Sequence, residues 1–210
     1  MIRKVIAYGK HFPEFYKAQE DNVKEKIGYV LDLVRLERQV PKKFFKYLEN
    51  TDGIYEVRVI TTFKSIRILC FFDDGNLVVL ANAFVKKNPK DTEKINQTRL
   101  KIEKRISQRK KITDMKNVTD FEDILIETYG KKGTQKRDKY DADSLAFRLG
   151  VMLKEARKEA NLTQEELAER TGTKKSYISR IERGLSDIQV STYYKLIELG
   201  LGKNLNIEIA

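Results

Sequence analysis

The stretch LTQEELAERTGTKKSYISRIERG, residues 162–184, decides the fold of the C-terminal part of the chain. Thr163 and Glu166 have the spacing of a capping box, in which each side chain bonds to the other residue's backbone N–H, so a helix is predicted to begin here. Gly172 ends that helix, because glycine adopts the left-handed conformation at little cost. Thr173 is then expected to cap the next helix. The stretch therefore predicts two short helices joined by a tight turn.

The residues before this stretch also have helical periodicity. One apolar stripe is formed by Leu145, Leu149, Met152, Leu153, Ala156 and Ala160. Residues 144–210 are therefore predicted to form an all-α domain. Before it, residues 119–129 carry four acidic side chains and no basic one, with apolar residues at helical spacing, which predicts an acidic amphipathic helix. Residues 131–139 are polar and are interpreted as a flexible connection.

The first half of the chain changes from the period of helices to that of strands. Residues 12–16 and 23–34 have apolar side chains at helical spacing. From residue 54 the pattern alternates, and strands are predicted at Ile54–Ile60, Ser65–Phe72 and Asn76–Lys86. A polar helix is predicted from about Pro89 to Arg109. The expected fold is an α+β domain, with helices packed on a small antiparallel sheet.

Alternation along these strands predicts which side chains share a face of the sheet. The face expected to pack on the helices carries Tyr55, Val57, Val59, Ile66, Ile68, Cys70, Phe72, Leu77, Val79, Ala81, Ala83 and Val85. The opposite face carries Glu56, Arg58, Arg67, Asn82, Phe84 and Lys86, with Lys64 and Lys87 at the hairpin ends. Neighbouring cations repel one another unless an anion lies between them. This face is therefore a candidate phosphate-binding site.

Composition excludes several classes of protein. The chain has 210 residues, with 42 Lys and Arg against 31 Asp and Glu, and most of its net charge of +11 lies in residues 1–114. Its longest apolar runs are too short to cross a membrane and no signal peptide is recognisable, so a cytoplasmic location without a membrane partner is expected. Cys70 is the single cysteine and His11 the single histidine, so no disulfide, metal site or cofactor is expected.

Residues 162–184 resemble the DNA-binding motif of phage-repressor-like (XRE-type) regulators. The resemblance implies that the second helix enters a major groove, where its side chains contact bases and phosphates. The candidate DNA-binding residues are Gln164, Lys174, Lys175, Ser176, Tyr177 and Arg180. Of these, Gln164 is expected to position a phosphate. The resemblance also implies an Arg157–Glu182 ion pair inside the domain, and a homodimer on a pseudo-palindromic operator.

Three segments of the first half, Tyr55–Arg58, Ser65–Leu69 and Ala83–Lys87, resemble RelE/HigB-like mRNA interferase toxins, across roughly residues 1–107. The resemblance implies a metal-independent endoribonuclease that cuts mRNA on the ribosome, with the ribose 2′-OH as nucleophile. Such a reaction requires stabilisation of the charged phosphorane, removal of one proton and supply of another. The candidate catalytic residues are Arg58, Arg67, Phe84, Lys86 and Lys87.

Each of these candidates has an expected role. Arg58 and Arg67 hold the scissile phosphate, because a guanidinium grips two phosphate oxygens at once. Phe84 stacks on a base, and Lys86 or Lys87 transfers a proton or stabilises charge. Glu56 is either a base or the ion-pair partner of Arg58, and the ion pair is the favoured interpretation.

The order of the two resemblances is that of HigB/HigA-type toxin–antitoxin operons, here in one chain. Residues 1–110 are expected to be the toxin, 111–143 a junction with a toxin-neutralising segment, and 144–210 the DNA-binding antitoxin that represses its own promoter. The tether raises the effective concentration of inhibitor, so the intact chain is expected to be inactive. One alternative is a transcription regulator whose first half is an inactive sensor or dimerisation module. Another is a general basic RNA-binding protein. The acidic helix is either the neutralising segment or an ordinary surface helix of the second domain.

Overall fold

The structure is a computed structural model that describes residues 2–73, 75–86 and 117–206. The helix predicted at Pro89–Arg109, and the candidate Lys87, lie outside the described residues. The chain divides into two compact units, Met1–Arg137 and Asp138–Ala210, which we treat separately. In the described ranges, no helix has the length and apolar character that a membrane crossing requires.

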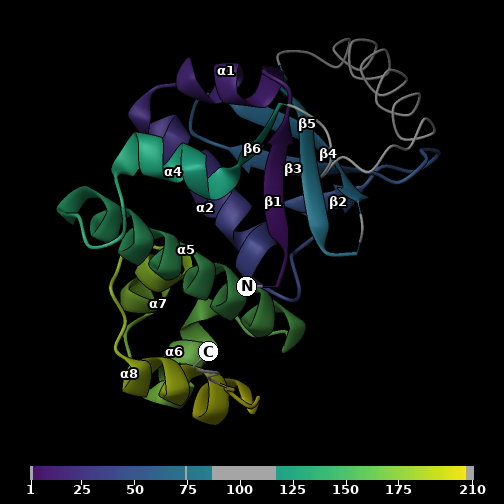
Figure 1. The fold of residues 1–210 in the computed structure, drawn as a ribbon. Coiled ribbons are helices and arrows are strands. Elements are labelled where there is room, and N and C mark those ends of the chain that lie inside the picture. Colours follow the sequence, from purple (N-terminus) through teal and green to yellow (C-terminus); the bar gives the residue numbers. More distant parts are fainter. Residues whose placement is uncertain (1, 74, 87–116, 207–210) are drawn as a thin grey trace. The chain divides into compact units, whose positions relative to one another are not determined.

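The first unit is built on a sheet that has six strands among its described residues, in the order β2-β3-β4-β5-β1-β6. The strands are β1 (Lys4–Tyr8), β2 (Phe45–Tyr47), β3 (Ile54–Ile60), β4 (Ser65–Asp73), β5 (Leu77–Val85) and β6 (Val118–Asp120). The helices α1 (His11–Lys17), α2 (Asp21–Leu36) and α4 (Phe121–Tyr129) belong to the same unit, and Figure 1 shows α2 and α4 against one face of the sheet. The α+β character of this unit is confirmed, and so are both early helices and all three predicted strands.

The sheet differs from the prediction in one respect, because it is mixed and not purely antiparallel. β1 pairs in parallel with β5, and β6 pairs with β1 in antiparallel orientation. The edge strand β2 was also not predicted. β2 and β6 have three residues each and β1 has five, which is too short for alternation to stand out from the surrounding sequence.

A β-bulge corrects the predicted faces of the sheet. Leu69 pairs with Asn82 but Cys70 pairs with Leu80, so one extra residue of β5 lies between them. The extra residue reverses the alternation in the first part of β5. As a result Leu77 and Val79 lie on the face of Arg67, where they join a buried cluster, and not on the helix-packing face. The assignment of Leu77, Val79 and Ala81 to the helix-packing face was therefore wrong.

The second unit is helical, as predicted. It contains most of α5 (Gln135–Glu159), followed by α6 (Gln164–Thr171), α7 (Lys175–Glu182), α8 (Val190–Tyr194) and a π-helical segment (Lys195–Gly200). Buried apolar residues from α5 to Leu201 form its core. The capping box of Thr163 and Glu166 is present, and Gly172 ends α6 with a left-handed φ of 58°.

Two local predictions in this part of the chain were wrong. The N-cap of α7 is Lys174 and not Thr173, whose hydroxyl lies 3.0 Å from that of Thr171. The flexible connection at residues 131–139 is a turn followed by the start of α5. That helix begins early because its buried stripe extends further toward the N-terminus than the predicted one. The stripe consists of Arg137, Tyr140, Ser144, Phe147 and Val151. Leu145 and Met152 of the predicted stripe are largely exposed.

Candidate nucleic-acid interfaces

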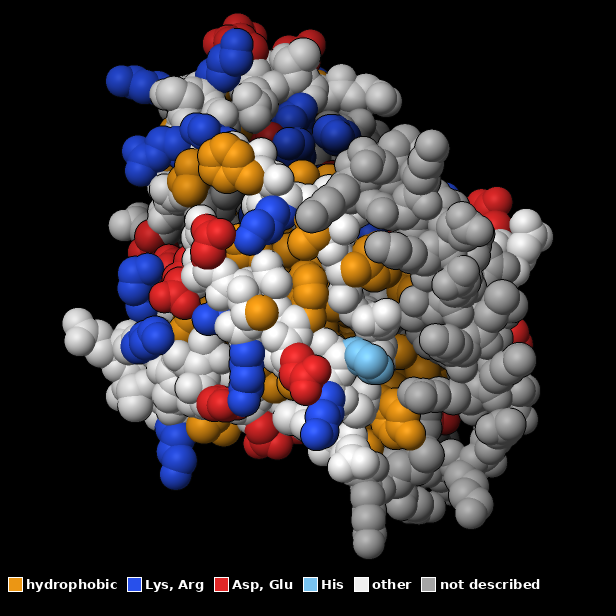
Figure 2. All heavy atoms as spheres, turned by 90° about the horizontal axis from the view of Figure 1, so that it is seen from above, with side chains coloured by type: hydrophobic (Ala, Val, Ile, Leu, Met, Phe, Trp, Pro, Cys, Tyr) orange, Lys and Arg blue, Asp and Glu red, His pale blue; other side chains and the backbone are white. Residues whose placement is uncertain are grey.

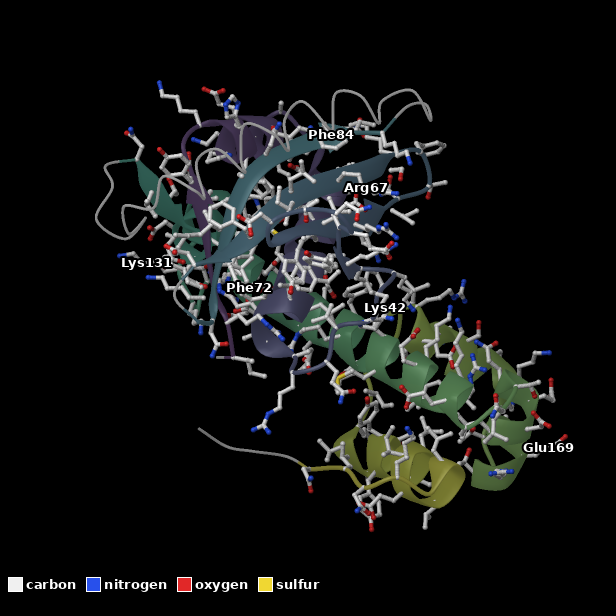
Figure 3. All side chains as sticks on the ribbon, turned by 90° about the vertical axis from the view of Figure 1, so that its right-hand side faces the viewer. Lys42, Arg67, Phe72, Phe84, Lys131 and Glu169 are labelled. Atoms are coloured by element: carbon white, nitrogen blue, oxygen red, sulfur yellow. The ribbon has the colours of Figure 1, made fainter. Side chains whose placement is uncertain are left out.

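The cationic face of the sheet brings three predicted residues together. Arg58 on β3 pairs directly with Arg67 on β4, and Arg67 pairs with Phe84 on β5. Directly opposed residues on neighbouring strands have their side chains on the same face, about 5 Å apart at Cβ. Figure 3 shows Arg67 and Phe84 on adjacent strands. The register therefore places two guanidinium groups and one aromatic ring in a row across the sheet.

Glu56 is the anchor of the two arginines. It is 5% exposed, and its Oε1 lies 2.5 Å from Nε of Arg58 and 3.4 Å from Nε of Arg67. This geometry agrees with the favoured interpretation of Glu56 as an ion-pair partner of Arg58. Glu56 is also close enough to pair with Arg67. One carboxylate between two guanidinium groups leaves a net positive charge, so the cluster remains attractive to an anion such as a phosphate.

Arg67 is held in place by its own strand. Its Nη1 donates to Oγ of Ser65 at 2.9 Å and to the carbonyl of Ile66 at 3.1 Å. Burial lowers the pKa of the Arg67 guanidinium, the Glu56 carboxylate acts to raise it, and the Arg58 charge acts to lower it. Two hydrogen bonds from one nitrogen hold the guanidinium in one position, which reduces the entropy that it would lose on binding an anion.

The other residues of the predicted site lie as follows. Phe84 is half-buried and packs against the apolar cluster on its face. Lys86 is exposed just after β5 and its backbone N–H donates to the carbonyl of Ser65 at 2.7 Å. Cys70 is buried in the core, where burial raises the pKa of its thiol. His11 opens α1 and is exposed, and Figure 2 shows the histidine at the surface. Among the described residues, no cluster of His, Cys, Asp and Glu is arranged to hold a metal ion.

The second candidate interface is the start of α7. Lys174, Lys175, Ser176 and Arg180 are exposed, whereas Tyr177 is half-buried against the helical core. Lys175 also makes an ion pair of 3.0 Å with Glu165 of α6. A row of exposed basic and hydroxyl side chains at the N-terminal end of a helix is suited to phosphates and base edges.

Gln164 lies differently from the prediction. Its Nε2 donates to Oε2 of Glu182 at 2.8 Å, so the side-chain amide is directed into the domain. Glu182 also accepts from Nε of Arg157 at 2.5 Å and from its Nη2 at 2.9 Å, which is the predicted ion pair in bidentate form. Burial acts to raise the pKa of Glu182, but the hydrogen bonds from Arg157 and Gln164 outweigh it and the pKa is lowered.

Glu182→Ala is expected to destabilise the second unit by about 3 kcal/mol, because it leaves the charge of Arg157 buried without its partner. Urea unfolding followed by circular dichroism measures the change. The matched control is Glu159→Ala, which removes an exposed ion pair with Lys203 and is expected to cost less than about 1 kcal/mol. Equal effects of the two substitutions would contradict a structural role for the buried pair.

The acidic helix α4 is bound to the first unit and is not a helix of the second. Phe121 and Leu125 are fully buried, and Asp120 caps the helix by accepting from the backbone N–H of Glu122 at 3.0 Å. Three basic residues from β1, α1 and α2 pair with this cap and with the helix itself: the ion pairs are Lys4–Asp120 at 3.1 Å, Lys17–Glu127 at 2.7 Å and Arg35–Glu122 at 2.8 Å. The acidic composition of this helix suits a basic partner. In the structure, that partner is the first half of the chain.

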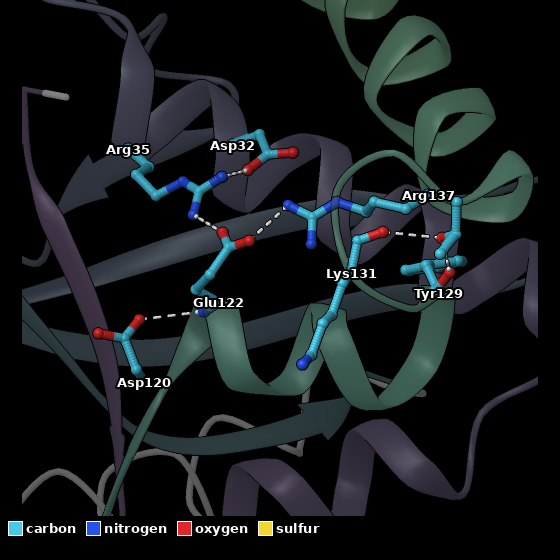
Figure 4. A network of polar contacts seen from close by, with 8 residues as sticks. Asp32, Arg35, Asp120, Glu122, Tyr129, Lys131 and Arg137 are labelled. Carbon is cyan, nitrogen blue, oxygen red and sulfur yellow. Dashed lines mark hydrogen bonds and ion pairs between the residues drawn. The ribbon is translucent and has the colours of Figure 1, made fainter.

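Glu122 is the centre of the network in Figure 4. Its two carboxylate oxygens accept from Arg35 at 2.8 Å and from Arg137 at 2.7 Å, and Arg35 also pairs with Asp32 at 2.8 Å. The Arg137 side chain is only 1% exposed. Arg35 lies over the ring of Phe121 as well, 5.7 Å from its centroid. Sequence analysis found the acidity of the helix but missed Arg35 and Arg137, which no local pattern connects to it.

Comparison with known families divides the chain as its structure does. Residues 14–111 match the family of the phage derived protein Gp49-like (DUF891), and residues 153–199 match the Helix-turn-helix family. No curated protein matches the chain. The chain is therefore similar to the Gp49-like family over most of its first unit and to the Helix-turn-helix family over most of its second. Both β6 and α4 lie outside the two matched ranges, although they are built into the first unit.

Proposed function

We propose that this protein is a toxin and its antitoxin in one chain. In this proposal the first unit is an mRNA endoribonuclease that acts on the ribosome, and the helix-turn-helix represses the promoter of its own gene. The observation that carries the proposal is the row of Arg58, Arg67 and Phe84 across the sheet. It is supported by the Gp49-like match, since that family is linked to RelE-type toxins.

The proposed cleavage uses the RNA's own 2′-hydroxyl. The 2′-oxygen attacks the adjacent phosphorus and loses its proton, while the bond from phosphorus to the 5′-oxygen breaks and the 5′-oxygen gains a proton. Arg67 and Arg58 stabilise the charge that develops on the phosphorane oxygens. Phe84 stacks on a neighbouring base. Lys86 or Lys87 carries a proton, whereas Glu56 keeps the two guanidinium groups in position.

In this proposal, neutralisation is the role of the junction, residues 111–143. Asp120 at the end of β6 pairs with Lys4, and the helix α4 that follows carries the acidic side chains that pair with Lys17 and Arg35. Because the segment is tethered, it rebinds at a high effective concentration and keeps the intact chain inactive. We further propose that the helix-turn-helix acts as a homodimer on operator DNA, with Lys174, Lys175, Ser176, Tyr177 and Arg180 at the DNA, and with Gln164 contributing its helix-terminal backbone N–H to a phosphate.

One observation favours a second candidate, a regulator with an inactive first half. Glu56 already neutralises part of the charge on Arg58 and Arg67, so the cluster also makes sense as a structural ion-pair network. This candidate predicts sequence-specific DNA binding without any RNA cleavage.

Arg67→Ala is expected to lower RNA cleavage by residues 1–114 about 100- to 1,000-fold, the usual cost of removing a group that stabilises transition-state charge. The assay is ribosome-dependent mRNA cleavage, with circular dichroism to verify that the fragment is folded. Lys42→Ala is the matched control, because it removes an exposed cation of the same unit outside the strands that carry the site. Absence of cleavage by a folded fragment would support the regulator.

A further inference from the structure

The turn between β3 and β4 presents an unusually exposed aromatic ring. Phe63 is 92% exposed and Ile60, at the end of β3, is 63% exposed. The turn itself is well held: the backbone N–H of Thr61 donates to the carbonyl of Lys64 at 2.9 Å, and the N–H of Lys64 donates to Oγ1 of Thr61 at 2.9 Å. A hydrogen-bonded turn that holds a large apolar side chain out to solvent is a candidate contact for a ligand with an apolar face.

A cavity of about 360 Å³ lies beside this ring. It is lined on one side by the turn and on the other by the beginning of α2, with Asn22, Lys26, Ile60, Thr61, Phe63 and Lys64 among its residues. Lys64 reaches across to Glu20, with Nζ 3.2 Å from Oε1. The volume is within the range of small-ligand sites, and the lining combines apolar surface with amide, hydroxyl and ammonium donors. A nucleobase has the size and the hydrogen-bonding edge for such a site.

The turn is also close to the arginine row along the same hairpin. Arg58 pairs with Arg67, and two residues further along the strands Ile60 pairs with Ser65, at the edge of the turn. Two residues of a strand span about 6.6 Å. The base of the turn is therefore about one nucleotide length from the arginines along the hairpin.

We propose that the turn Thr61–Lys64, with its cavity, is a base-binding subsite for single-stranded RNA next to the scissile phosphate. Phe63 stacks on one flanking base, as aromatic residues do in proteins that read single strands. The cavity receives the edge or the sugar of the neighbouring nucleotide, with Lys26 in its wall and with Lys64 paired to Glu20 of the same lining. Burial lowers the pKa of the Lys26 ammonium, which is consistent with its place in the cavity wall. This inference rests on the proposed RNA cleavage, and it describes how the RNA substrate is held.

The chain contains ten tyrosines but no tryptophan, so Phe63→Trp introduces a single tryptophan whose fluorescence can be excited selectively in the full-length protein. Titration with a short single-stranded RNA, made resistant to cleavage by 2′-O-methyl groups, is expected to quench this tryptophan saturably, because a stacked base quenches indole. Binding at the helix-turn-helix leaves the signal unchanged, since that unit then lacks a tryptophan. The matched control is Tyr47→Trp on β2, which replaces a 43% exposed aromatic residue and is expected to show no quenching. A second variant, Phe63→Ala in the full-length protein, is expected to weaken binding of the same RNA about tenfold, as for loss of one stacked base.

The outcomes separate this subsite from the proposed function. If Arg67→Ala abolishes cleavage but RNA does not quench Trp in Phe63→Trp, the subsite is wrong and the ribonuclease stands. If RNA quenches the tryptophan but no cleavage depends on Arg67, the subsite stands and the ribonuclease fails. Equal quenching in Phe63→Trp and Tyr47→Trp would overturn the subsite in favour of non-specific contacts.

Discussion

Glu122→Lys is expected to release α4 from the first unit and to switch on RNA cleavage by the full-length chain. The substitution replaces the carboxylate between Arg35 and Arg137 by a third cation, and Arg137 is almost completely buried. Removing one partner from such a site costs about 3 kcal/mol, which corresponds to roughly a hundredfold increase in the released population. Hydrogen exchange of the α4 backbone measures the release, and ribosome-dependent mRNA cleavage measures its consequence.

The control for this experiment is Asp123→Lys, which makes the same charge change on the next residue of α4. Asp123 is exposed, so the change is expected to leave both the exchange rate and the activity close to those of the unaltered chain. Release of α4 in Glu122→Lys without any gain of cleavage would rule out a neutralising role for this helix. Equal effects of both substitutions would show that net charge, and not the Glu122 network, holds the helix.

The same network makes the attachment of α4 dependent on pH. Burial acts to raise the pKa of Glu122, but hydrogen bonds from Arg35 and Arg137 outweigh it, so the pKa is lower in the folded protein than in the released helix. The stabilisation is therefore fully present above the ordinary glutamate pKa of about 4.3 and is lost as the pH falls through the lowered value. Hydrogen exchange of α4 should accelerate in that acidic range, and the acceleration attributable to this group should be missing from Glu122→Gln.

Gly150→Ala is expected to unfold the second unit. A Cβ at this position of α5 would lie 2.1 Å from the carbonyl oxygen of Ile181 and 3.2 Å from backbone atoms of Glu182 and Gly184. The obstacle is the backbone of α7 and its C-terminal turn, which cannot move aside without disrupting the core, so a loss of more than about 3 kcal/mol is expected. Gly202→Ala is the control without a clash, because nothing lies within 4 Å of the added Cβ. Its positive φ of 64° is expected to lower the free energy of unfolding by about 1 kcal/mol. Calorimetry measures the unfolding transition of the second unit. If Gly150→Ala retains this transition, the close packing of α5 on α7 is contradicted.

Sequence reasoning predicted the parts of the fold that depend on local signals. The helix-turn-helix follows from a capping box and a turn glycine, and the early helices and the β3–β5 strands follow from clear periodicities. The pairing of Arg58 with Arg67, and of Arg67 with Phe84, lies on the side of the bulge where simple alternation holds. For that reason Arg58, Arg67 and Phe84 were correctly predicted to share a face, while the remainder of β5 was placed on the wrong face.

What could not be predicted depends on contacts between distant segments. A bulge leaves no signature in the composition of β5, and β1, β2 and β6 are stabilised mainly by their neighbours in the sheet. The place of α4 was open for the same reason, since Glu122 meets Arg35 from a residue 87 positions earlier in the chain. Phe63 was passed over because an exposed aromatic residue in a turn has no periodic pattern to mark it.

The central claim, a ribonuclease and its inhibitor in one chain, is tested most directly by one comparison of ribosome-dependent mRNA cleavage. The assay compares residues 1–114, the full chain, and residues 1–114 with residues 115–210 added as a separate polypeptide. The account predicts cleavage by the fragment alone, no cleavage by the full chain, and loss of cleavage when the second polypeptide is added. Cleavage of equal strength in all three samples, or none by a correctly folded fragment, would contradict it.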